Sequence, residues 1–385
     1  MLIVVKILIF ICDNLELGGG GPEVVKRIAH GMTIRGNKVT IISGDSGNRY
    51  TSELKDYLLK LKVEICEIGF LWPTTFPNRK GKALIKRIIA ECDIVYFILW
   101  MGGIERYLLK MQFKFNVPII EGHHGQPENL YVKISTLQKI YYKIYGDRTG
   151  KNVRSFAAHH VLNKEHEAIL LKKNFKNIFL IGNGINIGEF KSNKIKGRVF
   201  KILYVGRLNR EKGIDKIDKL IKKLFESGID NFQIIIAGDG ELRDFIISLT
   251  NKFNNVIYKG FINDDERNEL YAECNCLLSL SETEAFFIAG LESLASGTPV
   301  ISIENSGVKE YIEDGVNGFI VKDIGEMNNK ILFLYDLYFN NYETYIGLSN
   351  RCKEFSLEYN WDTIIDKYLT MFHDTVKFFK SGENE

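Results

Sequence analysis

The sequence predicts an α/β protein made of two doubly wound parallel-sheet domains. Near the start of the chain, the apolar run VVKILIFIC is followed by a glycine-rich loop, an amphipathic helix-like run and a second apolar run, NKVTIIS. The same order returns from residue 200, with FKILYVG, a polar loop, a helix-like run and NFQIIIAGDG. A buried strand, a crossover helix and another buried strand are the repeating unit of a parallel sheet. Each repeat therefore marks the beginning of one domain.

Chain length and the remaining elements divide the sequence into two domains and a tail. A chain of 385 residues is long for a single hydrophobic core. We expect the first domain over residues 1–184, with further strands in CDIVYFILW and VPIIEGHHG. The second is expected over residues 185–360, with strands in NVIYKGF, CNCLLSLS and TPVISI. An amphipathic helical tail over residues 361–385 is expected to pack back on the first domain.

Composition excludes several classes of protein. The net charge of +3 is too small to indicate a nucleic-acid-binding protein. The six cysteines have no Cys-x-x-Cys pair and no histidine at metal-binding spacing, which is typical of reduced thiols in a cytoplasmic protein. The N-terminal run MLIVVKILIFIC is too short to span a bilayer and contains Lys6, so we interpret it as a buried strand.

In each predicted domain, the loop after the first strand has the composition of a phosphate-binding site. LGGGGPE, residues 17–23, places four glycines before Pro22, where the backbone can approach an anion at a helix start. GRLNREKG, residues 206–213, carries Arg207 and Lys212, two cations that would neutralise a diphosphate without a metal. A flexible turn and surface ion pairs remain the alternatives. The glycine loop fails the Gly-x-Gly-x-x-Gly pattern, which argues against a dinucleotide-binding oxidoreductase.

Two glutamates interrupt the apolar stretch SETEAFFIAGLESLASGTPVIS. If residues 284–292 were all helical, Glu284 and Glu292 would lie about 12 Å apart along the axis. That exceeds the roughly 5 to 9.5 Å between the two carboxyls of a glycosidase. The spacing favours two carboxylates that hold separate parts of one long ligand, such as the sugar and the ribose of a nucleotide-sugar.

Four motifs stand in a fixed order over residues 200–320: GRLNREKG, AGDGE, ETEAFFIAGLE and SGTPVIS. Together they resemble the donor-binding domain of glycosyltransferase family 4, the retaining GT-B transferases. In the first domain, LGGGGPEVVKRIAHG and EGHHGQ resemble the family's opening glycine loop and its strand that ends in His-Gly. The resemblance implies two Rossmann-like domains that face a central cleft, with the acceptor on the N-terminal side and the nucleotide-sugar donor on the C-terminal side.

The resemblance also implies roles for single residues. His124 and Glu284 would be catalytic, with Glu284 at the transferred sugar. The donor-binding residues would be Gly18, Gly19, Gly20, Arg207, Lys212, Phe286, Phe287 and Glu292. Of these, Arg207 and Lys212 would hold the diphosphate and Glu292 the ribose. Without the family context, His123 and His124 have a second interpretation as loop histidines with no special role.

The implied activity is a retaining, hexosyltransferase-type transfer from a nucleotide-sugar to a glycan, lipid-linked or other acceptor, in cell-surface polysaccharide or glycoconjugate biosynthesis. No cofactor and no metal are expected. Two departures leave alternatives open, because Ala285 and Phe287 stand where the family has glycines and Ser306 replaces one glycine of a later pair. A catalytically silent nucleotide-sugar-binding subunit, or another GT-B enzyme such as a nucleotide-sugar epimerase, would share the fold.

A basic and aromatic stretch raises the question of membrane contact. Residues 70–89, FLWPTTFPNRKGKALIKRII, combine aromatic side chains, five cations and an apolar component. These are the ingredients of a segment that lies on an anionic membrane. The alternative is a solvated basic helix whose apolar residues pack on their own domain. The expected location is cytoplasmic, with the first interpretation adding peripheral contact at the inner face of the cell membrane.

Overall fold

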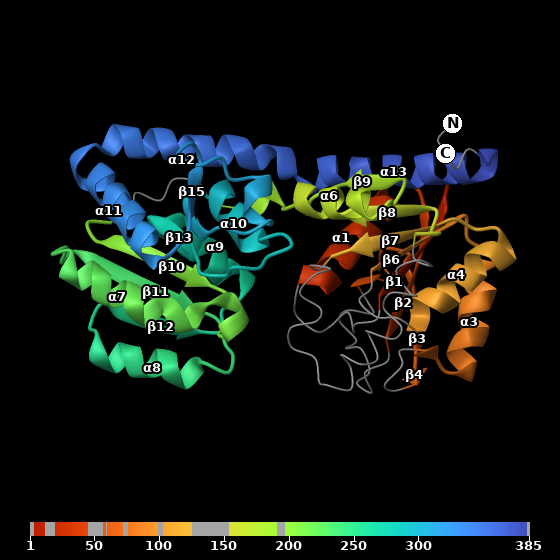
Figure 1. Cartoon of the computed structure of the whole chain (residues 1–385), viewed down its shortest axis with the longest axis horizontal. Helices are drawn as coiled ribbons and strands as arrows, with labels where there is room; N and C mark the ends of the chain where they lie inside the picture. Colours follow the sequence, from red (N-terminus) through yellow and green to blue (C-terminus); the bar gives the residue numbers. More distant parts are fainter. Residues whose placement is uncertain are drawn as a thin grey trace. The chain divides into compact units, whose positions relative to one another are not determined.

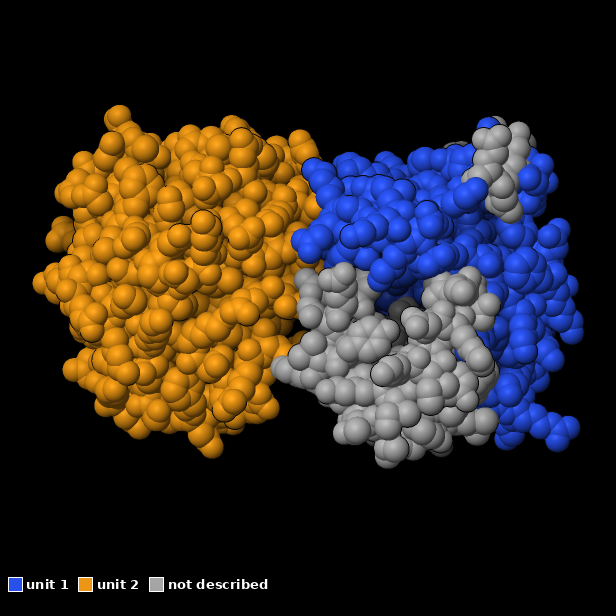
Figure 2. Space-filling view, in the orientation of Figure 1, with its two compact units in different colours: residues 1–183, 361–385 blue, residues 184–360 orange. Residues whose placement is uncertain are grey.

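The computed structural model describes residues 4–11, 20–44, 57–58, 60–71, 76–98, 103–124, 154–190 and 197–382. The chain divides into two compact units (Figure 2). Unit 1 comprises residues 1–183 and 361–385, and unit 2 comprises residues 184–360. The first boundary lies one residue before the boundary expected from the sequence, and the C-terminal tail belongs to unit 1.

Unit 1 is built on a parallel sheet with the order β3-β2-β1-β6-β7-β8-β9 (Figure 1). Its strands are β1 (Lys6–Ile11), β2 (Lys38–Gly44), β3 (Glu64–Ile68), β6 (Ile94–Ile98), β7 (Ile119–His123), β8 (Ala158–Val161) and β9 (Ile178–Leu180). The helices include α1 (Gly20–Ile34), α3 (Arg79–Ile89), α4 (Gly103–Phe115), α6 (Lys164–Lys172) and α13 (Trp361–Ser381). A short antiparallel hairpin joins β4 (Phe70–Leu71) to β5 (Phe76–Pro77).

The C-terminal helix α13 packs on α1 within unit 1. Gly31 of α1 makes this approach possible, because a Cβ there would lie 2.6 Å from the side chain of Ile365. Arg35, just after α1, donates a hydrogen bond from Nε to Asp366 Oδ1 over 2.7 Å. The tail of the sequence is therefore a structural part of the N-terminal domain.

Unit 2 has a second parallel sheet, with the order β12-β11-β10-β13-β14-β15. Its strands are β10 (Phe200–Val205), β11 (Phe232–Ala237), β12 (Val256–Gly260), β13 (Cys276–Ser279), β14 (Val300–Ile303) and β15 (Gly318–Val321). Its helices are α7 (Ile217–Glu226), α8 (Arg243–Lys252), α9 (Asp264–Glu273), α10 (Ile288–Ala295), α11 (Ile324–Asn340) and α12 (Tyr342–Ser356). In both units the chain starts in the middle of the sheet, builds one side and then crosses to the other, which is the doubly wound order. The predicted fold class is confirmed.

Helix α3 shows where part of the basic and aromatic stretch at residues 70–89 lies. Its apolar side chains at positions 85, 88 and 89 are buried in the core of unit 1. Its cations Lys80, Lys86 and Arg87 are exposed. These three side chains complete the domain core, as the alternative interpretation of this stretch expected. Contact through the cations alone stays a prediction, and Trp72 and the side chains of Phe70 and Phe76 lie outside the described residues.

The described part of the chain contains no helix that combines the length and the apolar character needed to cross a membrane. Its cysteines at positions 66, 92, 274, 276 and 352 are free thiols, and the last three are buried.

Candidate functional site

The predicted donor-binding residues of unit 2 gather where the strand order reverses. Between β10 and β13 the chain changes from building one side of the sheet to building the other. Ligands of open α/β sheets bind beyond the carboxyl ends of the strands at this point. Arg207 and Lys212 follow β10, and Glu284 follows β13. The two neighbouring loops therefore present these side chains at the same edge of the sheet.

Glycines allow these loops to pack closely against one another. Gly213 has a φ of +70°, and a Cβ at this position would overlap the carbonyl group of Leu280 in the loop after β13. Gly240, with a φ of +154°, lies so close to the loop after β10 that a Cβ would be 2.6 Å from the carbonyl oxygen of Leu208. No other residue fits these positions without moving a backbone. The glycines of GRLNREKG and AGDGE thus fix the shape of the loops that carry the cations.

Lys212 and Glu284 form an ion pair across the two loops. Lys212 Nζ lies 2.6 Å from Glu284 Oε1, with side chains that are 26% and 9% exposed. The backbone of Glu284 is held in place, because Ser306 Oγ donates a hydrogen bond to its carbonyl oxygen over 3.1 Å. Gly307 packs so closely there that a Cβ would lie 2.8 Å from the same oxygen. The Ser-Gly pair that replaces the expected diglycine therefore supports the Glu284 loop.

Arg207 differs from Lys212 in its surroundings. The residue is exposed, and its backbone carbonyl accepts a hydrogen bond of 3.1 Å from Tyr204 Oη. Within the described ranges, no ion pair engages its guanidinium group. A fixed backbone with an exposed guanidinium group suits the binding of an anion, since guanidinium binds phosphate oxygens in a bidentate manner.

Glu292 lies on α10, whereas Glu284 does not. The helix begins at Ile288, so the two glutamates do not share one helix. Glu292 Oε2 accepts a hydrogen bond of 2.9 Å from Tyr271 Oη and lies 3.3 Å from Arg267 Nε. Burial raises the pKa of the Glu292 carboxyl, although the charge of Arg267 counteracts this effect. Sequence reasoning missed both partners, which lie on α9.

Phe286 and Phe287 turn their side chains into unit 2. Both are buried, and the Phe286 ring contacts the rings of Tyr311 and Tyr359 with centroids 5.5 and 6.0 Å apart. Gly290 makes room for Phe287, because a Cβ there would lie 2.5 Å from Phe287 Cδ1. The rings are thus packed within the unit, so a donor contact at these positions would come from the backbone.

The two lost glycines cause no backbone strain. Neither Ala285 nor Phe287 is among the described non-glycine residues with positive φ, and Phe287 has φ −88° and ψ 82°. The native conformation therefore does not require glycine at either position. The departure from the family pattern does not by itself favour a silent subunit.

In unit 1, His124 follows β7 and joins a chain of hydrogen bonds. His124 Nε2 lies 2.7 Å from Tyr96 Oη, and the same oxygen lies 2.8 Å from His160 Nδ1. His160 Nε2 in turn lies 2.8 Å from the carbonyl oxygen of Ile181. Gly122 allows the Tyr96 ring to pass, because a Cβ would lie 2.8 Å from Tyr96 Oη.

The chain of hydrogen bonds assigns the protons. The Ile181 carbonyl can only accept, so His160 Nε2 carries a proton and its Nδ1 accepts the Tyr96 hydroxyl proton. Tyr96 Oη then accepts from His124 Nε2, which leaves His124 Nδ1 as an acceptor. Burial lowers the pKa of His124 well below its usual range and that of His160 to about 4, so both rings are neutral. His124 Nδ1 is therefore suited to accept a hydrogen bond from a ligand hydroxyl.

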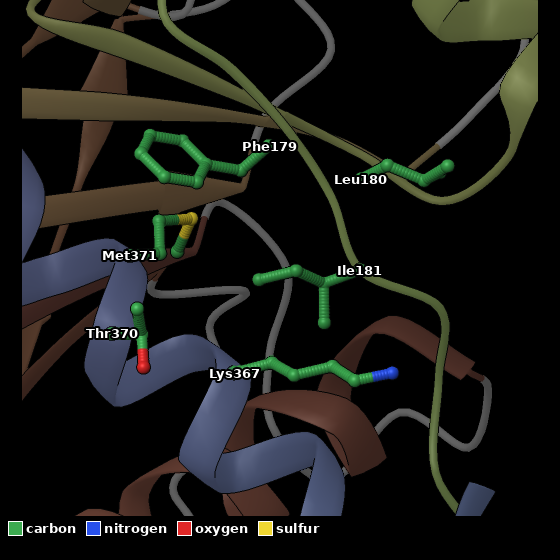
Figure 3. A pocket seen from close by; sticks show the side chains of 6 residues that line it. All are labelled: Phe179, Leu180, Ile181, Lys367, Thr370 and Met371. Atoms are coloured by element: carbon green, nitrogen blue, oxygen red, sulfur yellow. The ribbon is translucent and has the colours of Figure 1, made fainter. Parts of the chain in front are cut away.

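The remaining predicted residues and a hollow in unit 1 add no further contact to the site. Gly20 is the first residue of α1, and Gly18 and Gly19 lie outside the described residues. A hollow of about 230 Å³ in unit 1 is lined by residues of β9 and α13 with the connecting chain: Phe179, Leu180, Ile181, Lys367, Thr370 and Met371 (Figure 3). Its lining contains none of the predicted site residues.

Comparison with known proteins decides the family. The family model of the glycosyl transferases group 1 matches residues 187–345. The chain is 36% identical over 373 residues to the alpha-1,3/1,6-mannosyltransferase ALG2 of Dictyostelium discoideum, a match that covers 82% of this chain and 88% of that protein. The chain belongs to the group 1 glycosyltransferases. This glycosyltransferase is also 31% identical over 211 residues to MJ1607, a glycosyltransferase of Methanocaldococcus jannaschii, covering 50% of this chain and about half, 53%, of that protein.

Solved structures assign the fold of this glycosyltransferase. A glycosyltransferase of Rickettsia africae superposes with a TM-score of 0.75 at 18% identity, covering 97% of this chain and 99% of that one. HepE of Anabaena, in complex with UDP and glucose, superposes with a TM-score of 0.71 at 17% identity, covering 96% and 100%. The fold is GT-B, as the sequence predicted.

Proposed function

We propose that this glycosyltransferase moves a hexose from a nucleotide-sugar to an acceptor hydroxyl with retention of the anomeric configuration. The observation that carries the proposal is the Lys212–Glu284 ion pair at the switch point of unit 2. A cation and a carboxylate held side by side match the two chemical parts of the donor that meet there, the diphosphate and the sugar hydroxyls. Arg207 provides a second cation on the same loop.

Each residue then has a defined task. Arg207 and Lys212 neutralise the charge that develops on the leaving diphosphate. Glu284 accepts hydrogen bonds from the sugar, and Glu292 accepts from the ribose. His124 Nδ1 accepts a hydrogen bond from a hydroxyl of the substrate. In a front-face displacement the acceptor oxygen attacks the anomeric carbon as the bond to the diphosphate breaks, and a diphosphate oxygen takes the acceptor proton.

The relatives suggest a setting. Besides the mannosyltransferase ALG2, they include a 41.2 kDa protein in a cps region of Klebsiella pneumoniae, 26% identical over 190 residues. We infer that the acceptor is a growing glycan or a lipid-linked sugar in cell-surface polysaccharide or glycoconjugate biosynthesis.

Donor binding tests the assignments in unit 2. Replacing Arg207→Ala or Glu292→Gln should each weaken the binding of the preferred nucleotide-sugar by about 1.5 to 3 kcal/mol. The first change removes a charged donor to the diphosphate, and the second removes the charge of the group that accepts from the ribose. Isothermal titration calorimetry with UDP-, GDP- and ADP-sugars measures the effect. The matched control is Arg243→Ala, an exposed cation of α8 with no assigned role, which should leave affinity unchanged. Unchanged donor affinity in both site variants would refute these roles.

The cation pair also leads to a prediction about metals. Because Arg207 and Lys212 provide the positive charge at the diphosphate, turnover should be the same with added Mg²⁺, with added Mn²⁺ and with neither. A coupled assay for nucleoside diphosphate release measures it. A large increase in turnover with either ion would place a divalent metal at the diphosphate and contradict the proposal.

A further inference from the structure

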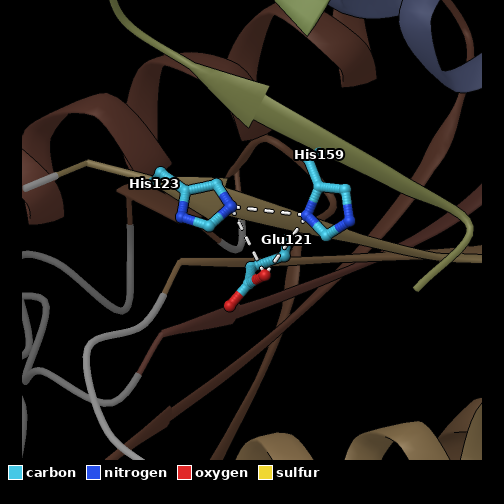
Figure 4. Close-up of side chains that lie close together, drawn as sticks. All are labelled: Glu121, His123 and His159. Atoms are coloured by element: carbon cyan, nitrogen blue, oxygen red, sulfur yellow. Dashed lines mark hydrogen bonds and ion pairs between the residues drawn. The ribbon is translucent and has the colours of Figure 1, made fainter. Parts of the chain in front are cut away.

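Three side chains of β7 and β8 converge beside His124 but have no task in the proposed transfer. Glu121 and His123 are two residues apart on β7, so they lie on the same face of the sheet. His159 on β8 is the register partner of Glu121. Its neighbour His160 points to the opposite face, where it belongs to the Tyr96 chain of hydrogen bonds. The three side chains point toward a common centre (Figure 4).

The three ligand-type atoms form a nearly equilateral triangle. Glu121 Oε2 lies 3.3 Å from His123 Nε2 and 3.3 Å from His159 Nδ1. The two ring nitrogens lie 3.3 Å from each other. Zinc with bonds of about 2.0 to 2.1 Å in tetrahedral geometry holds neighbouring ligand atoms about 3.3 to 3.4 Å apart. The triangle has the size of one face of that tetrahedron.

A cluster held together only by hydrogen bonds explains the arrangement less well. Glu121 is 4% exposed and His159 is fully buried. Among the described residues, Glu121 Oε2 accepts no hydrogen bond of suitable geometry, although both ring nitrogens lie near it. A buried carboxylate oxygen that accepts no hydrogen bond is costly, and a cation at the common centre would remove that cost.

The chemistry of the three groups fits zinc. Neutral imidazole and ionised carboxylate are the forms of these side chains that bind a metal. Two imidazole nitrogens and one carboxylate oxygen are a ligand set that zinc accepts, with a fourth position for water.

We propose that Glu121, His123 and His159 bind a structural zinc ion that ties β7 to β8 directly before His124. The proposal rests on the geometry of unit 1 and not on the proposed function. The ion would be separate from the diphosphate-binding cations of unit 2, so turnover would still need no added Mg²⁺ or Mn²⁺. Its role would be to hold the end of β7 in place, and with it the backbone that carries His124.

Metal analysis of the purified, tag-free protein tests the proposal. Inductively coupled plasma mass spectrometry should find about one zinc ion per chain after gel filtration in metal-free buffer. His159→Ala and the conservative Glu121→Gln should each lose most of it. His30→Ala is the matched control, because His30 lies on α1 and contacts Tyr57 instead. Zinc content that is unchanged in both cluster variants would overturn the proposal.

A titration keeps the test independent of how well the variants fold. The parent protein, stripped of metal, should gain thermal stability when zinc is added, because an ion that binds only the folded state raises the melting temperature. Cobalt(II) in its place should give the visible absorption of a tetrahedral site. A parent protein that carries no transition metal when purified, and whose melting temperature does not respond to zinc, would show that the cluster is only a group of packed polar side chains.

Discussion

Replacing Lys212→Ala should lower kcat/KM for the nucleotide-sugar roughly 10- to 150-fold. The substitution removes a charged contact to the diphosphate, worth about 1.5 to 3 kcal/mol. It also leaves Glu284, whose side chain is 9% exposed, without the cation that lies 2.6 Å away. The Glu284 carboxylate, no longer neutralised by Lys212, would repel the diphosphate, so the loss should appear in donor affinity as well as in kcat. Initial rates over a range of donor concentrations separate the two.

Lys216 provides the control for this variant. It lies four residues further along the chain and forms an ion pair with Glu282, whose side chain is 70% exposed. Exposed ion pairs contribute about 0 to 1 kcal/mol. Lys216→Ala should therefore leave both kinetic constants close to those of the parent enzyme. Equal losses in the two variants would mean that donor binding depends on the total positive charge near these loops and not on the Lys212–Glu284 pair.

Replacing Tyr96→Phe should lower kcat roughly 5- to 150-fold. The change keeps the ring but removes the hydroxyl that bridges His124 and His160 over 2.7 and 2.8 Å. Loss of a buried hydrogen-bond partner costs about 1 to 3 kcal/mol. Without this bridge, the His124 ring loses the hydrogen bond that fixes its orientation. Its proton is also no longer held on Nε2, so Nδ1 is no longer always the acceptor. Tyr96 would thus be a positioning residue for His124.

The readout must separate positioning from stability. Tyr107→Phe is the matched control, since this buried tyrosine of unit 1 also donates one hydrogen bond, to the Lys82 carbonyl over 3.0 Å. Both variants should lose thermal stability, because Tyr96→Phe removes two hydrogen bonds and Tyr107→Phe removes one, but only Tyr96→Phe should lose kcat. Donor affinity, measured by calorimetry, should be unchanged in both. If Tyr107→Phe loses as much kcat as Tyr96→Phe, the effect is one of stability and the tautomer assignment has no functional role.

The sequence was sufficient to predict the fold because local patterns carry it. Apolar runs such as FKILYVG and NFQIIIAGDG became the adjacent parallel strands β10 and β11, with the glycine-bearing loops at their carboxyl ends. The local structure between Glu284 and Glu292 was harder to predict. Phe287 ends the loop and α10 starts only at Ile288, because the Phe286 ring packs against Tyr311 and Tyr359 from elsewhere in the unit.

The contacts that tune the site were not predictable from local sequence. Tyr96 lies in the uniformly apolar strand IVYFI, where nothing marks it as a partner of His124. Arg267 and Tyr271 reach Glu292 from α9, a helix with no recognisable motif. Likewise, Glu121 and His159 meet only because β7 and β8 pair in register, so a search for metal-binding spacing along the chain misses them. Each case depends on tertiary pairing.

Analysis of the sugar released from a nucleotide-sugar tests the central claim most directly. Incubation of the parent enzyme with α-linked UDP-, GDP- and ADP-sugars, followed by proton NMR from the first minutes, reports both turnover and the anomeric configuration of the product before it equilibrates. We predict that at least one donor is consumed and that the first sugar formed, free or on an added acceptor, is the α-anomer. Release of the β-anomer first would contradict retention. If no nucleotide-sugar is consumed even when an extract that contains acceptors is present, the proposed activity itself is contradicted.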